Sequence, residues 1–278
     1  QAVLERGKGF LENRSARPES AFEDTVKVTM AQYHPRQRPW SLQLLNEMEL
    51  DKSFSFYQDR FADASDFTFF FVGNFDRKAI APRILTYLGG LPSVNRKETW
   101  KNTGIDPPQG IMKKHVYRGM EEKSITRIIF SGNFEWSREN RYTIQSMAQA
   151  FRIKLREVLR EDMSGVYGVG VRVKPKHYPE GEYTISISFG CAPDRVEELT
   201  NAVFQQIDSL KTTGLTDKYL TKVKEKQRRE RETNLKENRF WLNVLKTYDM
   251  HNEDFLDILE YEKLIKELSL ENIQKAAN

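Results

Sequence analysis

Residues 137–160 have the sequence SRENRYTIQSMAQAFRIKLREVLR, and this stretch does most to determine the fold class. Its apolar residues recur at intervals of three or four positions, at Ile144, Met147, Phe151, Leu155 and Val158. That spacing places them on one side of an α-helix. Ser137 is a suitable N-cap, because its hydroxyl can accept a hydrogen bond from a backbone N–H in the first turn. We therefore predict a long helix from residue 137 to about residue 160, with one face packed on a core.

Segments typical of β-strands lie in pairs on either side of this helix. They are Ile111 to Arg118 and Ser124 to Phe130 before it, and Val166 to Val173 and Tyr183 to Phe189 after it. In the last of these, apolar residues alternate with small polar ones, which predicts one buried face. A second helix is expected from Pro193-Asp194, with an apolar stripe at Val196, Leu199, Val203, Ile207 and Leu210. Strands joined directly in pairs favour antiparallel pairing, so we predict an α+β fold: an antiparallel sheet with helices on one face.

The N-terminal part is predicted to be mainly helical, with one strand. Residues 66–72, DFTFFFV, are short, aromatic and bounded by turn signals, as in a buried strand. Residues 93–110 are polar and contain Pro107-Pro108, which indicates a linker. We therefore expect two domains, 1–95 and 96–278. Near the end, residues 216–249 predict one very long charged helix.

The amino-acid composition limits which classes of function the protein can have. The 44 basic and 40 acidic residues leave a net charge of only +4, which gives little support for a nucleic-acid partner. The longest apolar run, residues 67–72, is far too short to span a membrane. Cys191 is the single cysteine, so no internal disulfide can form. Since Gln1 is not an initiator methionine and residues 1–14 have the pattern of a helix without an N-terminal cap, we expect the chain to be a piece of a longer protein.

Three stretches, in their order along the chain, resemble one family of proteases. They are His34-Pro35-Arg36 with Phe56-Tyr57 and Phe61 downstream, then 67–76 (FTFFFVGNFD) followed by 87–92 (YLGGLP), and then Leu159-Arg160-Glu161 followed by Ser164-Gly165-Val166-Tyr167. Together they resemble the C-terminal, non-catalytic half of the inverted-zincin (pitrilysin/insulinase) family of zinc metalloproteases. The resemblance implies four similar α+β domains in two halves that close like a clam shell. Residues 1–95 would then be the helical back part of the third domain, and 96–278 a complete fourth domain.

The chain lacks the catalytic signature of that family. The signature is His-x-x-Glu-His on a helix, where two histidines four positions apart can grip one zinc ion. Of the four histidines here, His34, His115, His177 and His251, no two are four residues apart. We therefore expect no metal ligands and no cofactor in this chain, and no catalysis by it alone. The resemblance implies that zinc is held in the catalytic half of the parent protein.

Arg160 and Tyr167 are the candidate site residues. In the family that the chain resembles, an Arg and a Tyr at this corner reach across the closed shell to the substrate backbone and the oxyanion. A guanidinium and a phenol suit this task, because both donate hydrogen bonds to developing negative charge. The alternative is structural: Arg160 complements a helix C-terminus and Tyr167 packs on a strand. For the functional role we expect both side chains to be partly exposed, near each other and directed outward.

The resemblance implies that the chain closes a substrate chamber and helps to position a polypeptide. Its partners would be a catalytic half, in the same chain or in a partner subunit, and the polypeptide substrate. Two alternatives stay open at this point: a catalytically dead structural or assembly subunit, and a peptide-binding module that uses an exposed sheet edge. A location in the cell envelope or periplasm follows from the family resemblance alone.

Overall fold

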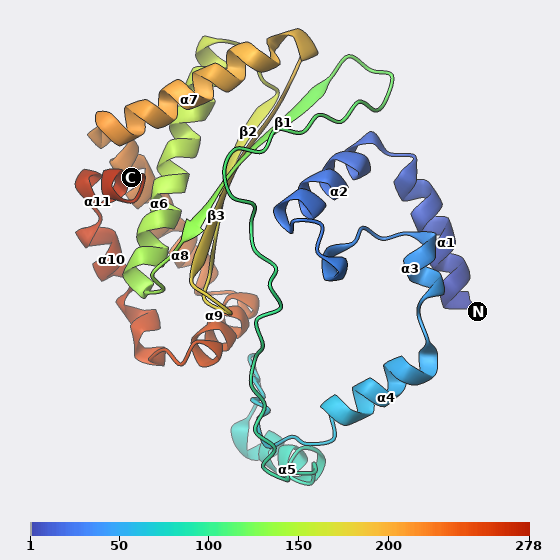
Figure 1. Ribbon diagram of the computed structural model, residues 1–278. Coiled ribbons are helices and arrows are strands. Elements are labelled where there is room, and N and C mark those ends of the chain that lie inside the picture. The colour runs from blue at the N-terminus through green and yellow to red at the C-terminus, as the bar shows by residue number, and fades with distance from the viewer. Residues whose placement is uncertain (1) are drawn as a thin grey trace. The chain divides into compact units, whose positions relative to one another are not determined.

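The computed structural model describes residues 2–278 and divides the chain into two units (Figure 1). The first unit extends to residue 69 and includes residues 75–121, and the second consists of residues 70–74 and 122–278. The expected domain boundary after residue 95 falls in a long stretch, 92–119, that has almost no regular secondary structure. The division of the chain into two family domains at that point stays a prediction.

The first unit is helical, as the sequence predicts. Its helices are α1 (Ala2–Ser15), α2 (Pro18–Met30), the 3-10 helix η1 (Pro35–Gln37), α3 (Leu42–Asn46), α4 (Leu50–Arg60) and α5 (Arg77–Tyr87). Capping residues fix several of the ends. The Asp76 carboxylate accepts hydrogen bonds from the N–H groups of Lys78 and Ala79 and so begins α5.

Two of the predicted strands do not form. Residues 66–72 and 111–118 contain no strand and belong to no sheet, and Phe67, Phe69 and Phe71 are 36%, 46% and 44% exposed. A strand exists only through hydrogen bonds to a neighbour, and within residues 2–278 no segment pairs with either stretch. The predictions of a buried strand at 66–72 and of a strand at 111–118 are therefore wrong for this chain.

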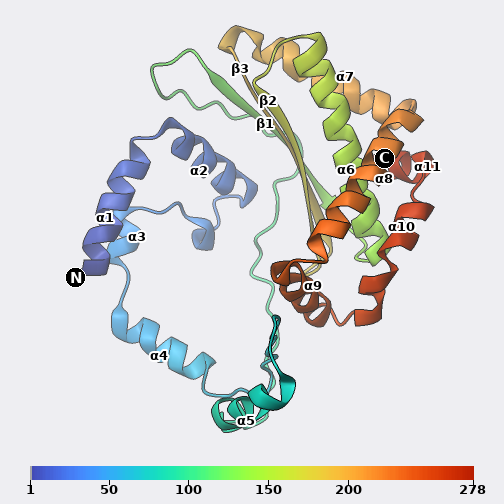
Figure 2. The same cartoon turned by 180° about the vertical axis from the view of Figure 1, so that it is seen from behind.

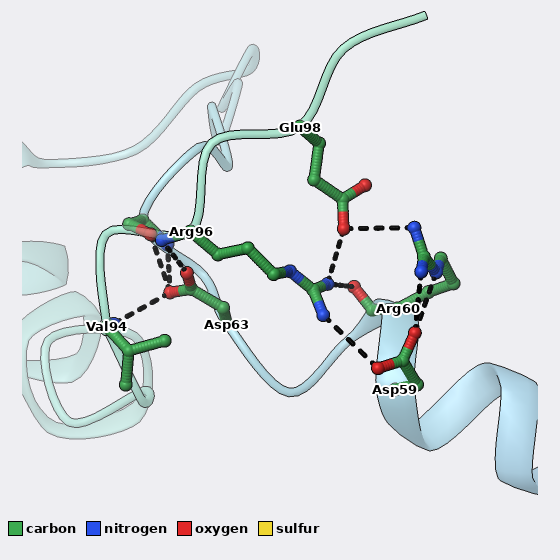
Figure 3. Close-up of polar contacts among 7 residues, drawn as sticks. Asp59, Arg60, Asp63, Val94, Arg96 and Glu98 are labelled. Carbon is green, nitrogen blue, oxygen red and sulfur yellow. Dashed lines mark hydrogen bonds and ion pairs between the residues drawn. The ribbon is translucent and has the colours of Figure 1, made fainter. Parts of the chain in front are cut away.

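A buried carboxylate fastens the linker to the end of α4 in the first unit (Figure 3). Asp63 Oδ1 accepts hydrogen bonds from the hydroxyl and N–H of Ser65 and from the Val94 N–H, at 2.6, 3.0 and 3.0 Å. Its Oδ2 accepts the Arg96 N–H at 2.6 Å. These hydrogen bonds, led by the Ser65 hydroxyl, hold the pKa of Asp63 well below its usual range. The guanidinium of Arg96 continues the network to Glu98 at 2.6 Å.

The second unit is the predicted α+β layer. Its elements are β1 (Ser124–Asn133), α6 (Arg138–Arg156), the π-helical segment η2 (Glu157–Asp162), β2 (Gly168–Lys176), β3 (Glu182–Cys191), the 3-10 helix η3 (Pro193–Arg195), α7 (Val196–Thr212), α8 (Asp217–Asn234), α9 (Asn238–Met250), the 3-10 helix η4 (Phe255–Glu260), α10 (Tyr261–Glu267) and α11 (Leu270–Lys275). The described strands form one antiparallel sheet in the order β1-β3-β2. Helices α6 and α7 lie on one face of it, as both views show (Figures 1 and 2).

The core lies between the sheet and these helices. Ile187 of β3 is opposite Ile128 of β1 and Val171 of β2. The alternation predicted for 183–189 is confirmed at its C-terminal end, where Ile187 and Phe189 are buried while the intervening Ser188 is not; Tyr183 and Ile185 are partly buried against the core. The stripe on α6 is also confirmed: Ile144, Met147, Phe151 and Leu155 are buried. On α7, Leu199, Val203 and Leu210 are buried.

The long helix predicted for 216–249 is interrupted, so that prediction is wrong. Helix α8 ends at Asn234, and α9 begins at Asn238 after an extended N-cap residue, Glu237. The break lets the chain fold back on itself: the guanidinium of Arg231 on α8 lies 4.9 Å from the ring centre of Phe240 on α9 and 4.9 Å from that of Tyr261. A straight helix would lose this stacking, which is favourable when the cation is partly desolvated.

A buried polar network joins α8 to α6. The Tyr142 hydroxyl donates to Gln227 Oε1 at 2.6 Å, and Gln227 Nε2 donates to Ser146 Oγ at 2.9 Å. All three side chains are buried. Burial also raises the pKa of the Tyr142 phenol, so it stays protonated and able to donate.

Gln227→Ala is expected to lower the free energy of unfolding by about 1–3 kcal/mol, because it leaves buried groups of Tyr142 and Ser146 without partners. Gln205→Ala, at an exposed position of α7, is the matched control and should have almost no effect. Denaturant unfolding measures both. Equal effects of the two substitutions would show that the network does not stabilise the fold.

Candidate functional site

The candidate site lies at the corner between the end of α6 and the start of β2. Here the α-helix widens into the π-helical segment η2, in which the Met163 N–H donates to the Val158 carbonyl at 3.1 Å. Such π turns occur often at functional sites. The Gly165 N–H then reaches back to the Leu159 carbonyl at 2.9 Å, and the Tyr167 N–H donates to the Gly190 carbonyl at 3.1 Å. These bonds tie both arms of the corner to the sheet and to the helix.

Gly165, at the tip of this corner, leaves no room for a side chain unless Leu199 moves. A Cβ atom on Gly165 would lie 2.5 Å from Leu199 Cδ2 and 3.2 Å from Arg195 Nη1, closer than packed side chains allow. The preceding Ser164 has a φ of 48°, in the left-handed region. The Arg195 guanidinium also donates to the Met163 carbonyl, at 3.2 and 3.3 Å. The turn is therefore packed tightly against α7.

Each of the two candidate residues directly follows a buried residue in the sequence. Leu159 is fully buried and Arg160 beside it is exposed, whereas Val166 is 8% exposed and Tyr167 is 82% exposed. Within residues 2–278, neither the Arg160 guanidinium nor the Tyr167 hydroxyl has a hydrogen-bond or ion-pair partner. The corner thus presents two free donors on a fixed backbone, which suits hydrogen bonding to a bound group. Their expected proximity to each other stays a prediction.

Hydrogen bonds and ion pairs hold Glu157 of η2 to side chains of α8. Glu157 accepts hydrogen bonds from Lys222, Tyr219 and Lys218, at 2.9, 2.8 and 3.1 Å. These partners, Lys222 foremost, lower the pKa of Glu157 to about 2. Burial, together with the Glu157 carboxylate, raises the pKa of Tyr219 to about 12. The segment that carries Arg160 is therefore held on both sides, by α7 and by α8.

Two features of the second unit were missed by sequence reasoning. The first is a groove of about 680 Å³ lined by residues of α6, η2, β2 and α8. Lys222 and Lys226, from the segment that the sequence predicts as a long charged helix, line this groove. The second is a histidine pair, in which the Nδ1 atoms of His177 and His251 lie 3.0 Å apart beside Trp136. Residues 74 positions apart give no sequence signal of such a contact.

The donor set of the chain does not fit a catalytic zinc ion. Throughout residues 2–278, no group of three or more His, Cys, Asp or Glu side chains is arranged to hold a metal. Apart from the pair, His34 accepts the Arg36 N–H as the cap of η1, and His115 stacks on Tyr117. A catalytic zinc ion requires about three protein ligands, and these histidines do not supply them.

Comparisons with known proteins agree with this geometry. The sequence profile of the family described as "Peptidase M16 inactive domain" matches residues 47–227. The probable zinc protease PqqL of Haemophilus influenzae is 29% identical over 170 residues, covering 60% of this chain and 18% of that protein. The zinc protease PQQL-like of Arabidopsis thaliana is 25% identical over 256 residues, covering 87% of this chain and 27% of that protein.

A solved structure shares the fold over the whole chain. The periplasmic protease PqqL from Escherichia coli superposes with a TM-score of 0.84 at 17% identity, covering 99% of this chain and 30% of that one. The chain therefore spans less than a third of the length of each of these three proteins. No helix in the described part of the chain combines the length and apolar content that crossing a membrane requires.

Proposed function

The chain belongs to the family of peptidase M16 inactive domains, and from this premise we propose that it is the non-catalytic half of a zinc metalloendopeptidase. In this role it closes the substrate chamber and helps to position a polypeptide substrate. The zinc ion would be held by the catalytic half, in the same chain or in a partner subunit. The observation that carries the proposal is the corner at residues 157–167, where two unpartnered donors stand exposed on a tightly packed turn.

Arg160 and Tyr167 have complementary roles in this proposal. The guanidinium carries a permanent positive charge and several N–H donors, and the phenol supplies one directed O–H. Donors held in place before the reaction stabilise the charge that develops on the scissile carbonyl oxygen, since they need not reorganise as it forms. The packing of Gly165 against Leu199 and the bonds of Arg195 to Met163 support that preorganisation.

We expect the purified chain to hold no zinc tightly and to cleave no peptide alone, because it offers no ligand set. Metal analysis and a peptidase assay of untagged protein check both expectations, and the same assay with the catalytic half added should show chelator-sensitive cleavage. A zinc ion held by side chains of this chain, together with chelator-sensitive activity of the chain alone, would overturn the proposal.

The cell envelope is the proposed compartment for the parent protein. The support is the fold shared with the Escherichia coli protease, which is described as periplasmic. Fractionation of cells that express the full-length parent, followed by detection of this segment, tests it.

A further inference from the structure

Strand β2 is an edge of the sheet in the second unit. The strand order is β1-β3-β2, so β2 pairs with β3 on one side, and no other described strand pairs with its outer side. An unpaired edge offers a row of backbone N–H and C=O groups to an added strand. Pro175 lacks an N–H and limits pairing near the end of β2, so the usable edge extends from about Gly168 to Lys174.

The groove described above lies beside this edge. Val171 and Val173 of β2 line it, opposite Ala148, Arg152 and Ile153 of α6. No residue of β1 or β3 lines it, so the groove is located at the β2 side of the sheet instead of beneath its centre. A strand added about 4.8 Å from β2 would direct every second side chain toward the groove. Its volume of about 680 Å³ is within the range of sites that bind ligands.

The groove carries an excess of positive charge. It contains four cationic side chains, Arg152, Arg156, Lys222 and Lys226, and two carboxylates, Glu157 and Glu161. Both carboxylates are already paired, Glu157 with Lys218 and Lys222 and Glu161 with Arg156. Arg152 is exposed and has no ion-pair or hydrogen-bond partner in the described chain. A ligand that enters the groove therefore meets a cation that is not neutralised.

The opposite face of β2 is also cationic. Successive residues of a strand point to opposite faces, so Arg172 and Lys174 point away from the groove that Val171 and Val173 line. Both are exposed, and in the described chain neither is paired with a carboxylate. Cations on an edge strand oppose pairing with a second copy of the same edge. They attract an edge of opposite charge instead.

From this arrangement we propose that the β2 edge binds an extended, acidic polypeptide segment by strand addition. Its main chain pairs with residues 168–174, acidic side chains on one face interact with Arg152 in the groove, and those on the other face interact with Arg172 and Lys174. That the bound segment is part of a substrate rests on the function proposed above. Tyr167 directly precedes β2, so a bound segment extends toward the candidate corner.

A nucleic acid is the other extended anion to consider. Single strands of DNA or RNA are bound by stacking their bases on aromatic side chains along a basic groove. The residues that line this groove include no aromatic side chain, and β2 contains none. An exposed main-chain edge, in contrast, is specific for a peptide. The observations therefore favour an acidic peptide.

The test measures how tightly this protein binds a short fluorescent peptide that carries glutamates on both faces when it is extended. Binding is followed by fluorescence anisotropy at low salt. Arg152→Glu and Lys174→Glu should each weaken binding by about fivefold or more, because each loses an ion pair and gains repulsion. Lys236→Glu makes the same charge change at an exposed position outside the groove and should leave affinity unchanged. If Lys236→Glu weakens binding as much, the attraction is unspecific and the proposal is overturned.

Main-chain pairing is tested with two N-methylated versions of the peptide, methylated at alternate residues in the two possible sets. Only one set of N–H groups faces β2, so one version should lose binding and the other should keep it. Equal binding by both versions would exclude strand addition. Tighter binding of a single-stranded oligonucleotide than of the peptide would also overturn the proposal. No catalytic half is present in these assays, so their failure leaves the proposed role of Tyr167 in turnover untouched.

Discussion

Tyr167→Phe is expected to lower kcat by about 10²–10³-fold in an enzyme assembled from this chain and its catalytic half. The substitution removes one hydroxyl, which is a donor that we propose meets developing negative charge on the scissile carbonyl oxygen. The ring stays, and since the side chain is 82% exposed, folding depends little on it. The predicted signature is therefore a large kinetic loss with an unchanged free energy of unfolding.

The matched control is Tyr87→Phe, which makes the same change at a tyrosine that is 75% exposed in the first unit. It should leave kcat unchanged. Steady-state kinetics and denaturant unfolding of both variants give the comparison. If the Tyr167 variant keeps full kcat, the proposed role of that hydroxyl has to be abandoned, and the corner becomes a structural turn. Arg160→Lys adds a further distinction, because it keeps the charge but loses the planar, multiple donors of the guanidinium.

Phe151→Ala is expected to lower the free energy of unfolding of the second unit by about 3–5 kcal/mol. The ring is 2% exposed and lies in the core cluster between α6 and the sheet. Its removal loses buried apolar surface and leaves a cavity that the surrounding residues fill only partly. A loss of this size is a large fraction of the roughly 5–15 kcal/mol that typically stabilises a domain.

Phe255→Ala is the control for this substitution, because that ring is 44% exposed in η4. It should change stability by no more than about 0.5 kcal/mol. Urea denaturation followed by circular dichroism measures both variants. A similarly small change for Phe151→Ala would mean that the α6 stripe does not form the core.

Local patterns in the sequence determined the helices and one buried face of the sheet. The three- and four-residue spacing on α6 and α7 and the alternation in β3 predicted which residues are buried, because periodicity depends only on neighbours in the chain. The Ser137 cap predicted where α6 begins for the same reason. The spacing of Arg160 and Tyr167 was also available in the sequence, but its meaning came from resemblance to a protease family.

Tertiary structure decided everything that depends on residues far apart in the chain. Residues 66–72 and 111–118 have the composition of strands, yet a strand requires a partner that the sequence does not specify. The break at residues 235–237 places Arg231 against Phe240 and Tyr261, contacts that no helical period reveals. Likewise, the free edge of β2 and the cations on either side of it belong to three elements, α6, β2 and α8, that only folding brings together. The charged residues can be read from the sequence, but their positions around the β2 edge exist only in the folded chain. Those positions oppose pairing with another cationic edge and favour pairing with an acidic strand.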